Sequence, residues 1–434
     1  MKTFKATALV VLGLFVCALQ SQAENKTLEF NVNGLKVILK QTQKETIVMS
    51  MYFRGGLSNY PAKNAGIESL ALSGLTSCGT KTLSSNKVDE QCDEYNLGLT
   101  TEANSDFSSI TLKCISRYVN EGWSVFSSAL AAPSFEPRRF ELLRAKKIDI
   151  VQSKASSPDI RLERLAIETA FANSLYTTDP NGTAESLAGL PLDTVKNYYY
   201  NTLLNKNRMF LVVAGNISRE DLETKIQAAF SSLPSRPYEE PKIQPELFSR
   251  DVYKAENRQV ATTYICGLIN APQLNHNDYP AKKIASILLH SAIFREIRIN
   301  KQLSYAPRAS ISMGRMPYLT MYASTSQPGE AVKTMVATLN RVKQVTYTDA
   351  TIEELRKSFI QSDLKRQEKM AAIVESLGEA EILGGWHLAE DMANRASSVT
   401  GKDVRNALQY YSQHIAWAFL GDSSIAEQTF NPTN

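Results

Sequence analysis

The sequence predicts an α+β protein built from two copies of one plan of strands and helices. Its 434 residues exceed the size at which a single hydrophobic core keeps growing, so more than one domain is expected. Two segments roughly 209 residues apart have similar patterns, which is the signature of an internal repeat. Within each segment strands and helices do not alternate strictly, and this favours α+β layers over a doubly wound parallel sheet.

The N-terminal residues have the pattern of an export signal. Lys2 and Lys5 precede an apolar run over residues 6–19, and residues 21–23 place small side chains where a signal peptidase reads them. The run is too short for a comfortable bilayer span. We therefore expect residues 1–23 to be a cleaved signal peptide. The mature chain is expected in a bacterial periplasm and without a membrane span; secretion or mitochondrial import is disfavoured.

The repeat consists of apolar strands that recur in the same order in both halves. The expected pairs of strands are residues 47–53 with 260–265, 110–115 with 319–323, and 208–215 with 416–421. A helix precedes the last strand of each half, and both helices have a Thr and an Asp near the first turn. Such side chains cap free backbone N–H groups at helix starts.

A proline-rich segment separates the two halves. Residues 233–249 contain Pro234, Pro237, Pro241 and Pro245, and proline at this density cannot continue a helix or a central strand. We therefore expect an N-terminal repeat over residues 24–232, a linker over 233–249 and a C-terminal repeat over 250–434. The formal charge of +4 gives no reason to expect nucleic-acid binding.

Three stretches resemble the insulinase/pitrilysin family of zinc metallopeptidases, in its processing-peptidase-like branch. Residues 66–80 are similar to the active-site helix of the family, residues 192–215 to the segment that closes its first domain, and residues 294–305 to its substrate-side motif. They occur in the order and spacing of the family, and the resemblance covers roughly residues 28–424. It implies two mostly antiparallel sheets with packed helices, facing each other as a clamshell around a chamber for peptides or unfolded polypeptides.

Active members of this family carry the zinc motif HxxEH on the first helix. Positions i, i+3 and i+4 share one helix face, so two imidazoles can bind zinc while the Glu polarises a water molecule. In this chain the three positions read Ser69, Leu72 and Ser73, and a register shifted by one residue gives Leu70, Ser73 and Gly74. A neutral Ser hydroxyl is a poor zinc ligand and Leu cannot act as a base.

The loss of the zinc site does not depend on that alignment. The first histidine of the chain is His276, so the first half has no imidazole at any position. The family's further Glu ligand, roughly 70–80 residues after the motif, is also missing, because residues 147–152 read KIDIVQ. We therefore expect this chain to bind no metal and to have no peptidase activity of its own.

The substrate-side motif is better preserved. Arg298 and Tyr305 match the Arg and Tyr of the family that bind the substrate backbone and stabilise the charge developing on the scissile carbonyl. The alternative is that Arg298 lies on a solvated helix face and Tyr305 starts a strand.

The resemblance implies a functional hypothesis with an alternative. In heterodimeric relatives one subunit binds zinc, while the other lacks zinc and supplies the Arg/Tyr pair. This chain resembles the second kind, so we expect a substrate-binding subunit that assists catalysis while a homologous HxxEH partner supplies zinc. An inert peptide-binding or structural protein of the same fold, similar to the core subunits of the cytochrome bc1 complex, is the alternative.

Overall fold

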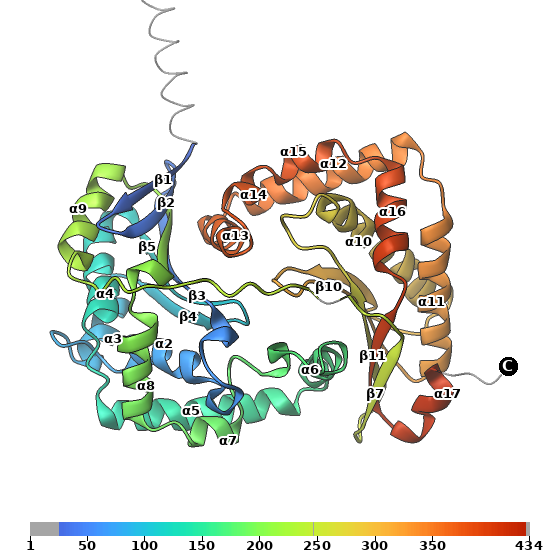
Figure 1. Cartoon of the computed structure of the whole chain (residues 1–434), viewed down its shortest axis with the longest axis horizontal. Helices are drawn as coiled ribbons and strands as arrows, with labels where there is room; N and C mark the ends of the chain where they lie inside the picture. The colour runs from blue at the N-terminus through green and yellow to red at the C-terminus, as the bar shows by residue number, and fades with distance from the viewer. Residues whose placement is uncertain (1–25, 246, 431–434) are drawn as a thin grey trace, which may run out of the picture.

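The computed structural model describes residues 26–245 and 247–430, so the expected signal peptide over residues 1–23 lies outside them. Two β-sheets stand on opposite sides of the molecule, each with helices packed on it (Figure 1). This arrangement is the α+β fold of two similar halves that the sequence predicts. No helix in the described part of the chain is long and apolar enough to cross a membrane.

The first half contains a six-stranded sheet of order β1-β2-β6-β3-β5-β4. All neighbouring strands are antiparallel except β2 and β6, which run parallel. Its strands are β1 (Thr27–Val32), β2 (Leu35–Gln41), β3 (Thr46–Arg54), β4 (Gly98–Ala103), β5 (Phe107–Ile115) and β6 (Met209–Gly215). Its α-helices are α2 (Ile67–Ser77), α3 (Ser85–Glu94), α4 (Val119–Ala131), α5 (Pro137–Ser156), α6 (Pro158–Ala170), α7 (Ala184–Ala188), α8 (Leu192–Tyr198) and α9 (Arg219–Phe230).

The second half repeats this topology in a five-stranded sheet of order β7-β11-β8-β10-β9, again with one parallel pair, β7 and β11. The repeat is therefore exact in strand order, and β1 is an addition to the first half. Its strands are β7 (Val252–Asn257), β8 (Thr263–Asn270), β9 (Arg308–Ser312), β10 (Tyr318–Thr325) and β11 (Ile415–Gly421). Its α-helices are α10 (Tyr279–Ile293), α11 (Pro328–Gln344), α12 (Asp349–Arg366), α13 (Met370–Ile382), α14 (His387–Glu390), α15 (Met392–Ser397), α16 (Gly401–Tyr411) and α17 (Ala426–Phe430).

One expected strand was wrong in its position. The sequence predicted a strand over residues 260–265 that ends before Gly267, whereas β8 runs from Thr263 to Asn270 with Gly267 inside it. The ring of Trp417 on β11 packs against this glycine, and a Cβ there would lie 2.7 Å from the ring. Gly267 therefore makes room for a neighbouring aromatic side chain and does not end the strand.

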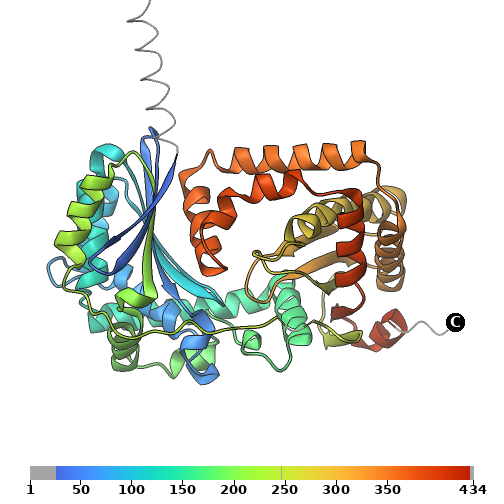
Figure 2. The same cartoon turned by 45° about the horizontal axis from the view of Figure 1, so that its top comes forward.

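The two halves exchange one helix each. Helix α13 of the second half covers the inner face of the first sheet, where Leu377 packs with Tyr52 and Phe210 (Figure 2). Helix α6 of the first half covers the second sheet, where Leu165 packs with Cys266. Each exchanged helix directly follows the long helix of its own half, α5 or α12. Both faces of each sheet are thereby buried, and this explains why the central strands are almost continuously apolar.

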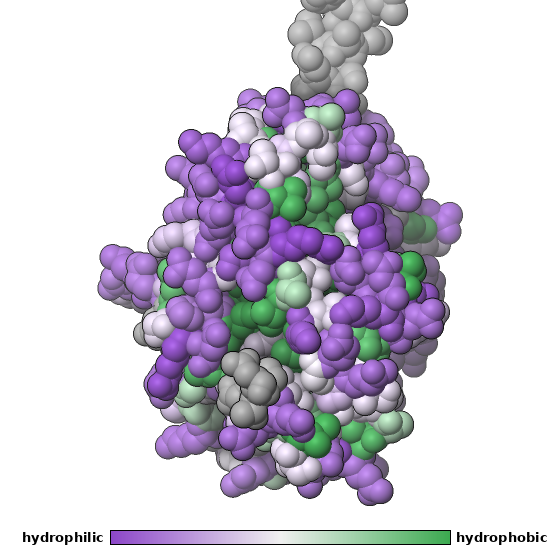
Figure 3. All heavy atoms as spheres, turned by 90° about the vertical axis from the view of Figure 1, so that its right-hand side faces the viewer, coloured by the Kyte–Doolittle hydropathy of each residue, from purple (hydrophilic) through white to green (hydrophobic). Residues whose placement is uncertain are grey.

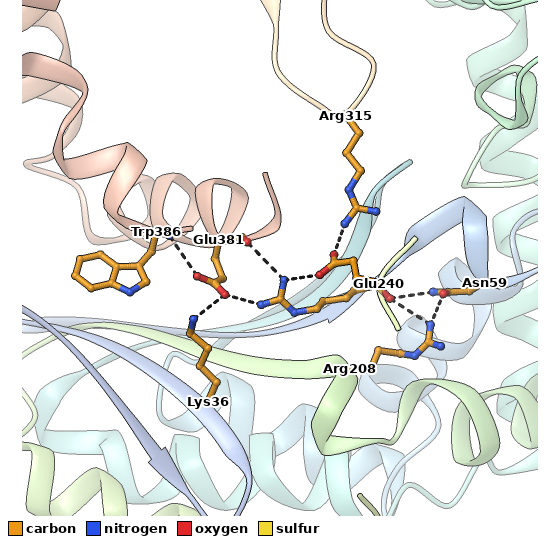
Figure 4. Close-up of polar contacts among 8 residues, drawn as sticks. Lys36, Asn59, Arg208, Glu240, Arg315, Glu381 and Trp386 are labelled. Carbon is orange, nitrogen blue, oxygen red and sulfur yellow. Dashed lines mark hydrogen bonds and ion pairs between the residues drawn. The ribbon is translucent and has the colours of Figure 1, made fainter. Parts of the chain in front are cut away.

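The proline-rich segment crosses between the halves as extended chain, and its described residues contain no helix or strand (Figure 1). Glu240 in this segment accepts an ion pair from Arg54 of β3, at 3.1 Å, and another from Arg315 in the turn between β9 and β10. Arg54 also pairs with Glu381 of α13, at 2.5 Å (Figure 4). Charged groups from both halves and the connecting segment thus form one network at the junction.

The outer face of the second half is mostly hydrophilic. Figure 3 shows hydrophilic residues over most of this face, with hydrophobic residues in separate spots along its middle. Scattered spots of this kind are normal for a protein surface in water.

Candidate functional site

A cavity of about 920 Å³ lies between the two halves. Helices α2, α5 and α6 and strand β4 form its walls in the first half, and the turn between β9 and β10 closes it from the second half. Its volume is in the range of ligand-binding pockets, roughly 300–1,000 Å³. It can hold a short peptide segment but not a folded domain.

The degenerate zinc positions lie on the wall of this cavity. Ser69 and Leu72 of α2 line it, and the Ser73 hydroxyl lies 3.2 Å from the hydroxyl of Thr101 on β4, which also lines it. In the shifted register, Leu70 is fully buried in the core and Gly74 packs against a core phenylalanine. Of the two registers, the one with Ser69, Leu72 and Ser73 is therefore the one that places residues, Ser69 and Leu72, on the cavity wall.

Lys147 lies against Ser69, the first of the three degenerate zinc positions. The Lys147 ammonium on α5 donates a hydrogen bond to the Ser69 hydroxyl, with Nζ and Oγ 3.0 Å apart. Burial, and then the nearby positive charges of Lys154 and Lys146, lower the pKa of Lys147. Residue 147 begins the segment in which the family's distal Glu ligand is expected. The sequence shows that this Glu is missing, but it does not predict that the Lys147 side chain lies against Ser69.

A zinc ion does not fit this arrangement. The side chains at the motif positions are two hydroxyls and an alkyl group, and a fixed ammonium would repel a dication at contact distance. Across residues 26–245 and 247–430, no group of three or more His, Cys, Asp or Glu side chains is placed to hold a metal ion. The motif helix therefore keeps its place in the fold while its metal chemistry is replaced.

The strand beside these residues offers a free edge. Among the described residues, strand β4 is the last strand of the first sheet and pairs with β5 alone. The Asn104 N–H donates to the Phe107 carbonyl across the hairpin, at 2.8 Å. By the alternation of antiparallel ladders, the backbone groups of Thr101 and Ala103 point away from β5. An extended peptide in the cavity can pair with these groups.

A buried carboxyl group fixes the motif helix from another side. Glu68 of α2 is 1% exposed and accepts hydrogen bonds from Asn59, at 2.7 Å, and from the Tyr198 hydroxyl, at 2.6 Å. Burial raises the pKa of Glu68, and burial together with this carboxyl raises the pKa of Tyr198. Glu68 does not line the cavity, so we assign it to positioning α2.

The Arg298/Tyr305 pair lies outside the cavity. The Arg298 guanidinium lies 4.2 Å from the centre of the Tyr305 ring and 5.0 Å from that of Phe294. Tyr305 is 79% exposed, and neither it nor Arg298 lines the cavity. The structure thus brings Arg298 and Tyr305 together, but it does not bring them to the degenerate zinc positions of the same chain.

Comparisons with known sequences agree with this fold and site. Residues 192–359 match the family described as "Peptidase M16 inactive domain". The chain is 20% identical over 426 residues to "Non-peptidase homolog YmxG" of Helicobacter pylori, covering 95% of this chain and 96% of that protein. It is 21% identical over 422 residues to an "Uncharacterized zinc protease" of Rickettsia bellii, covering 92% and 98%.

Solved structures share the whole fold. A protease from Helicobacter pylori superposes with a TM-score of 0.84 at 15% identity, covering 92% of this chain and 99% of that one. A peptidase M16 inactive domain from Pseudomonas fluorescens gives 0.81 at 14% identity, covering 92% and 98%. The periplasmic protease PqqL from Escherichia coli gives 0.74 at 11% identity, and this chain covers 46% of it.

The fold and the substituted motif together define a metallopeptidase-like protein without the family's zinc ligands. Residues 192–359 match the M16 inactive-domain family, and over nearly its whole length the chain has the fold of M16 proteins and is similar to a protein named a non-peptidase homologue; this is the insulinase/pitrilysin family that its motifs resemble.

Proposed function

We propose that this chain is the substrate-binding subunit of a two-chain zinc peptidase of the periplasm, in which a homologous HxxEH chain supplies the metal. The placement of Arg298 and Tyr305 carries the proposal. A pair that lies outside its own cavity, with Tyr305 79% exposed, is available to a site on another chain. The metal of that partner would activate water; zinc is not expected on this chain.

The stacked pair has the chemistry that this role requires. A guanidinium and a phenol O–H are donors that can hold a peptide carbonyl and the negative charge that develops on it. Their stacking at 4.2 Å restrains both side chains before substrate arrives, and fixed donors lose less on binding than mobile ones. The free edge of β4 supports the other part of the role, which is to hold an extended peptide.

The test is the double variant Arg298→Ala with Tyr305→Phe in the complex purified from the native host. If the co-purifying partner carries HxxEH, we expect the variant complex to assemble normally and to cleave an unstructured peptide at least about 100-fold more slowly. Arg295→Ala is the matched control, since Arg295 is an exposed arginine of the same segment, and it should leave turnover unchanged. Undiminished cleavage by the double variant would refute the assigned roles.

A second candidate, peptide capture without cleavage, is favoured by the cavity itself. The 920 Å³ volume and the unpaired edge of β4 are contained in this chain alone. This candidate requires no HxxEH partner. A chain that purifies alone, binds unstructured peptides and leaves them intact would support capture over assisted cleavage.

A further inference from the structure

Lys147 on the cavity wall forms no ion pair with a carboxylate of the described residues. Burial, and then the positive charges of Lys154 and Lys146, lower the pKa of Lys147. Its one hydrogen-bond partner among the described residues is the neutral hydroxyl of Ser69. Lys147 is only partly exposed, and charges removed from water are normally paired, so an unpaired ammonium at this position is unusual.

Several other charged groups of the cavity wall already have partners. Arg161 pairs with Glu168 and Glu256, and Arg164 donates to the backbone carbonyls of Tyr176 and Thr177. Asp106, also on the wall, accepts from Tyr176 and from the backbone N–H of Arg315. These groups are structural, whereas the Lys147 ammonium keeps two of its three N–H donors free for a ligand.

The neighbouring hydroxyl completes a site for an anion. Ser69 accepts from Lys147 and can donate its own proton to a second acceptor. It lies in the first turn of α2 (Ile67–Ser77), near the positive end of the helix dipole. Two donors and one positive charge without an ion-pair partner among the described residues therefore converge at the first of the degenerate zinc positions.

We propose that Lys147 and Ser69 bind the C-terminal carboxylate of a peptide that lies in the cavity along β4. A carboxylate has the charge and the two acceptor oxygens that these donors can satisfy. An interior peptide carbonyl would leave the ammonium uncompensated, so the end of a peptide fits better than its middle. The inference rests on the proposed peptide-binding function and adds the end of the peptide that is recognised.

The test compares one unstructured peptide as its free acid and as its C-terminal amide. Binding of each to the full mature chain, without a partner chain, is measured by fluorescence anisotropy. We expect the acid to bind about tenfold more tightly or better, because the amide loses the charge-assisted hydrogen bonds. Lys147→Met should abolish the preference, and Ser69→Ala should reduce it several-fold. The control Lys146→Met changes an exposed lysine of the same helix and should keep the preference.

The outcomes separate this inference from the proposed function. Equal affinity for acid and amide in the unmodified chain, or a preference that survives in a folded Lys147→Met variant, overturns the carboxylate site while peptide binding stands. Binding of neither peptide refutes the site and peptide binding by this chain together. Circular dichroism melting establishes that each variant is folded, and Ser69→Ala provides a second perturbation that leaves the charge in place.

Discussion

Replacing the buried Lys282 by methionine should stabilise the protein at neutral pH. Lys282 is 0% exposed on α10, and its only hydrogen-bond partner among the described residues is the Ser412 hydroxyl, at 3.1 Å. Burial, and then the positive charge of Lys343, lower the pKa of Lys282 to about 7. Methionine has a similar length and no charge, so it can fill the same space.

The size and direction of the effect follow from this pKa. A fall from 10.5 to about 7 corresponds to an upper limit of about 5 kcal/mol between the two protonation states. Between these two pH values the unfolded chain binds more protons than the folded chain, so the stability of the unmodified protein rises with pH across this window. Below about pH 7 the folded state bears the full penalty of the buried charge. In the Lys282→Met variant the buried Ser412 hydroxyl loses its hydrogen-bond partner, and this cost offsets about 1–3 kcal/mol of the gain in stability.

The assay is urea denaturation of both proteins at pH 6.5 and at pH 10. We expect Lys282→Met to be more stable than the unmodified chain by about 2–4 kcal/mol at pH 6.5, with the difference shrinking toward pH 10. Lys333→Met is the control, because Lys333 is exposed on the neighbouring helix α11, and it should have little effect at either pH. A variant that is less stable at pH 6.5, or a difference that does not depend on pH, would refute the reasoning.

Two further predictions concern the junction of the halves. Arg315→Ala should destabilise the protein by about 1–2 kcal/mol, because it leaves the partly exposed Glu240 with Arg54 as its remaining cation. Faster proteolysis of the segment 233–249 would report this loosening, and an unchanged cleavage rate would contradict it. Gly378→Ala should cost about 1–3 kcal/mol, because its Cβ would lie 2.1 Å from the Tyr52 ring beneath α13. Urea denaturation measures the loss, and a neutral effect would mean that α13 can move away from the first sheet.

The fold could be predicted from the sequence to the extent that local patterns determine it. Strands β6 and β11 are short apolar runs that end in glycine, and the predicted residues 208–215 and 416–421 match them closely. The expected Thr/Asp capping is confirmed at α16, where Thr400 and Asp403 form a capping box, but it is wrong for α8, which begins after Pro191 with no side-chain cap. The error at β8 arose because Gly267 is needed for a contact with Trp417, 150 residues away, and no local pattern reports such a contact.

The exchange of α6 and α13 could not be predicted for a similar reason. Both helices have apolar residues at helical spacing, which indicates that a face is buried but not which sheet covers it. The inner faces of the two sheets are buried only because each half contributes a helix to the other. Neither sheet can therefore reach its observed burial without the opposite half, and the cavity between them has its shape only when both halves are folded.

The candidate site shows the same limit at the level of single residues. The absence of zinc ligands was evident from composition, because a half without histidine cannot supply an imidazole. What replaced them depends on how α5 packs against α2, which places Lys147 against Ser69 across 78 residues of sequence. The loss of zinc ligands can be established from the sequence of one segment, because it depends on which residues are present. The Lys147–Ser69 contact depends on how two distant segments pack, and the sequence of neither segment shows it. The substituted motif is thus better described by what Lys147 now adds, a fixed positive charge beside a free strand edge, than by the metal it lacks.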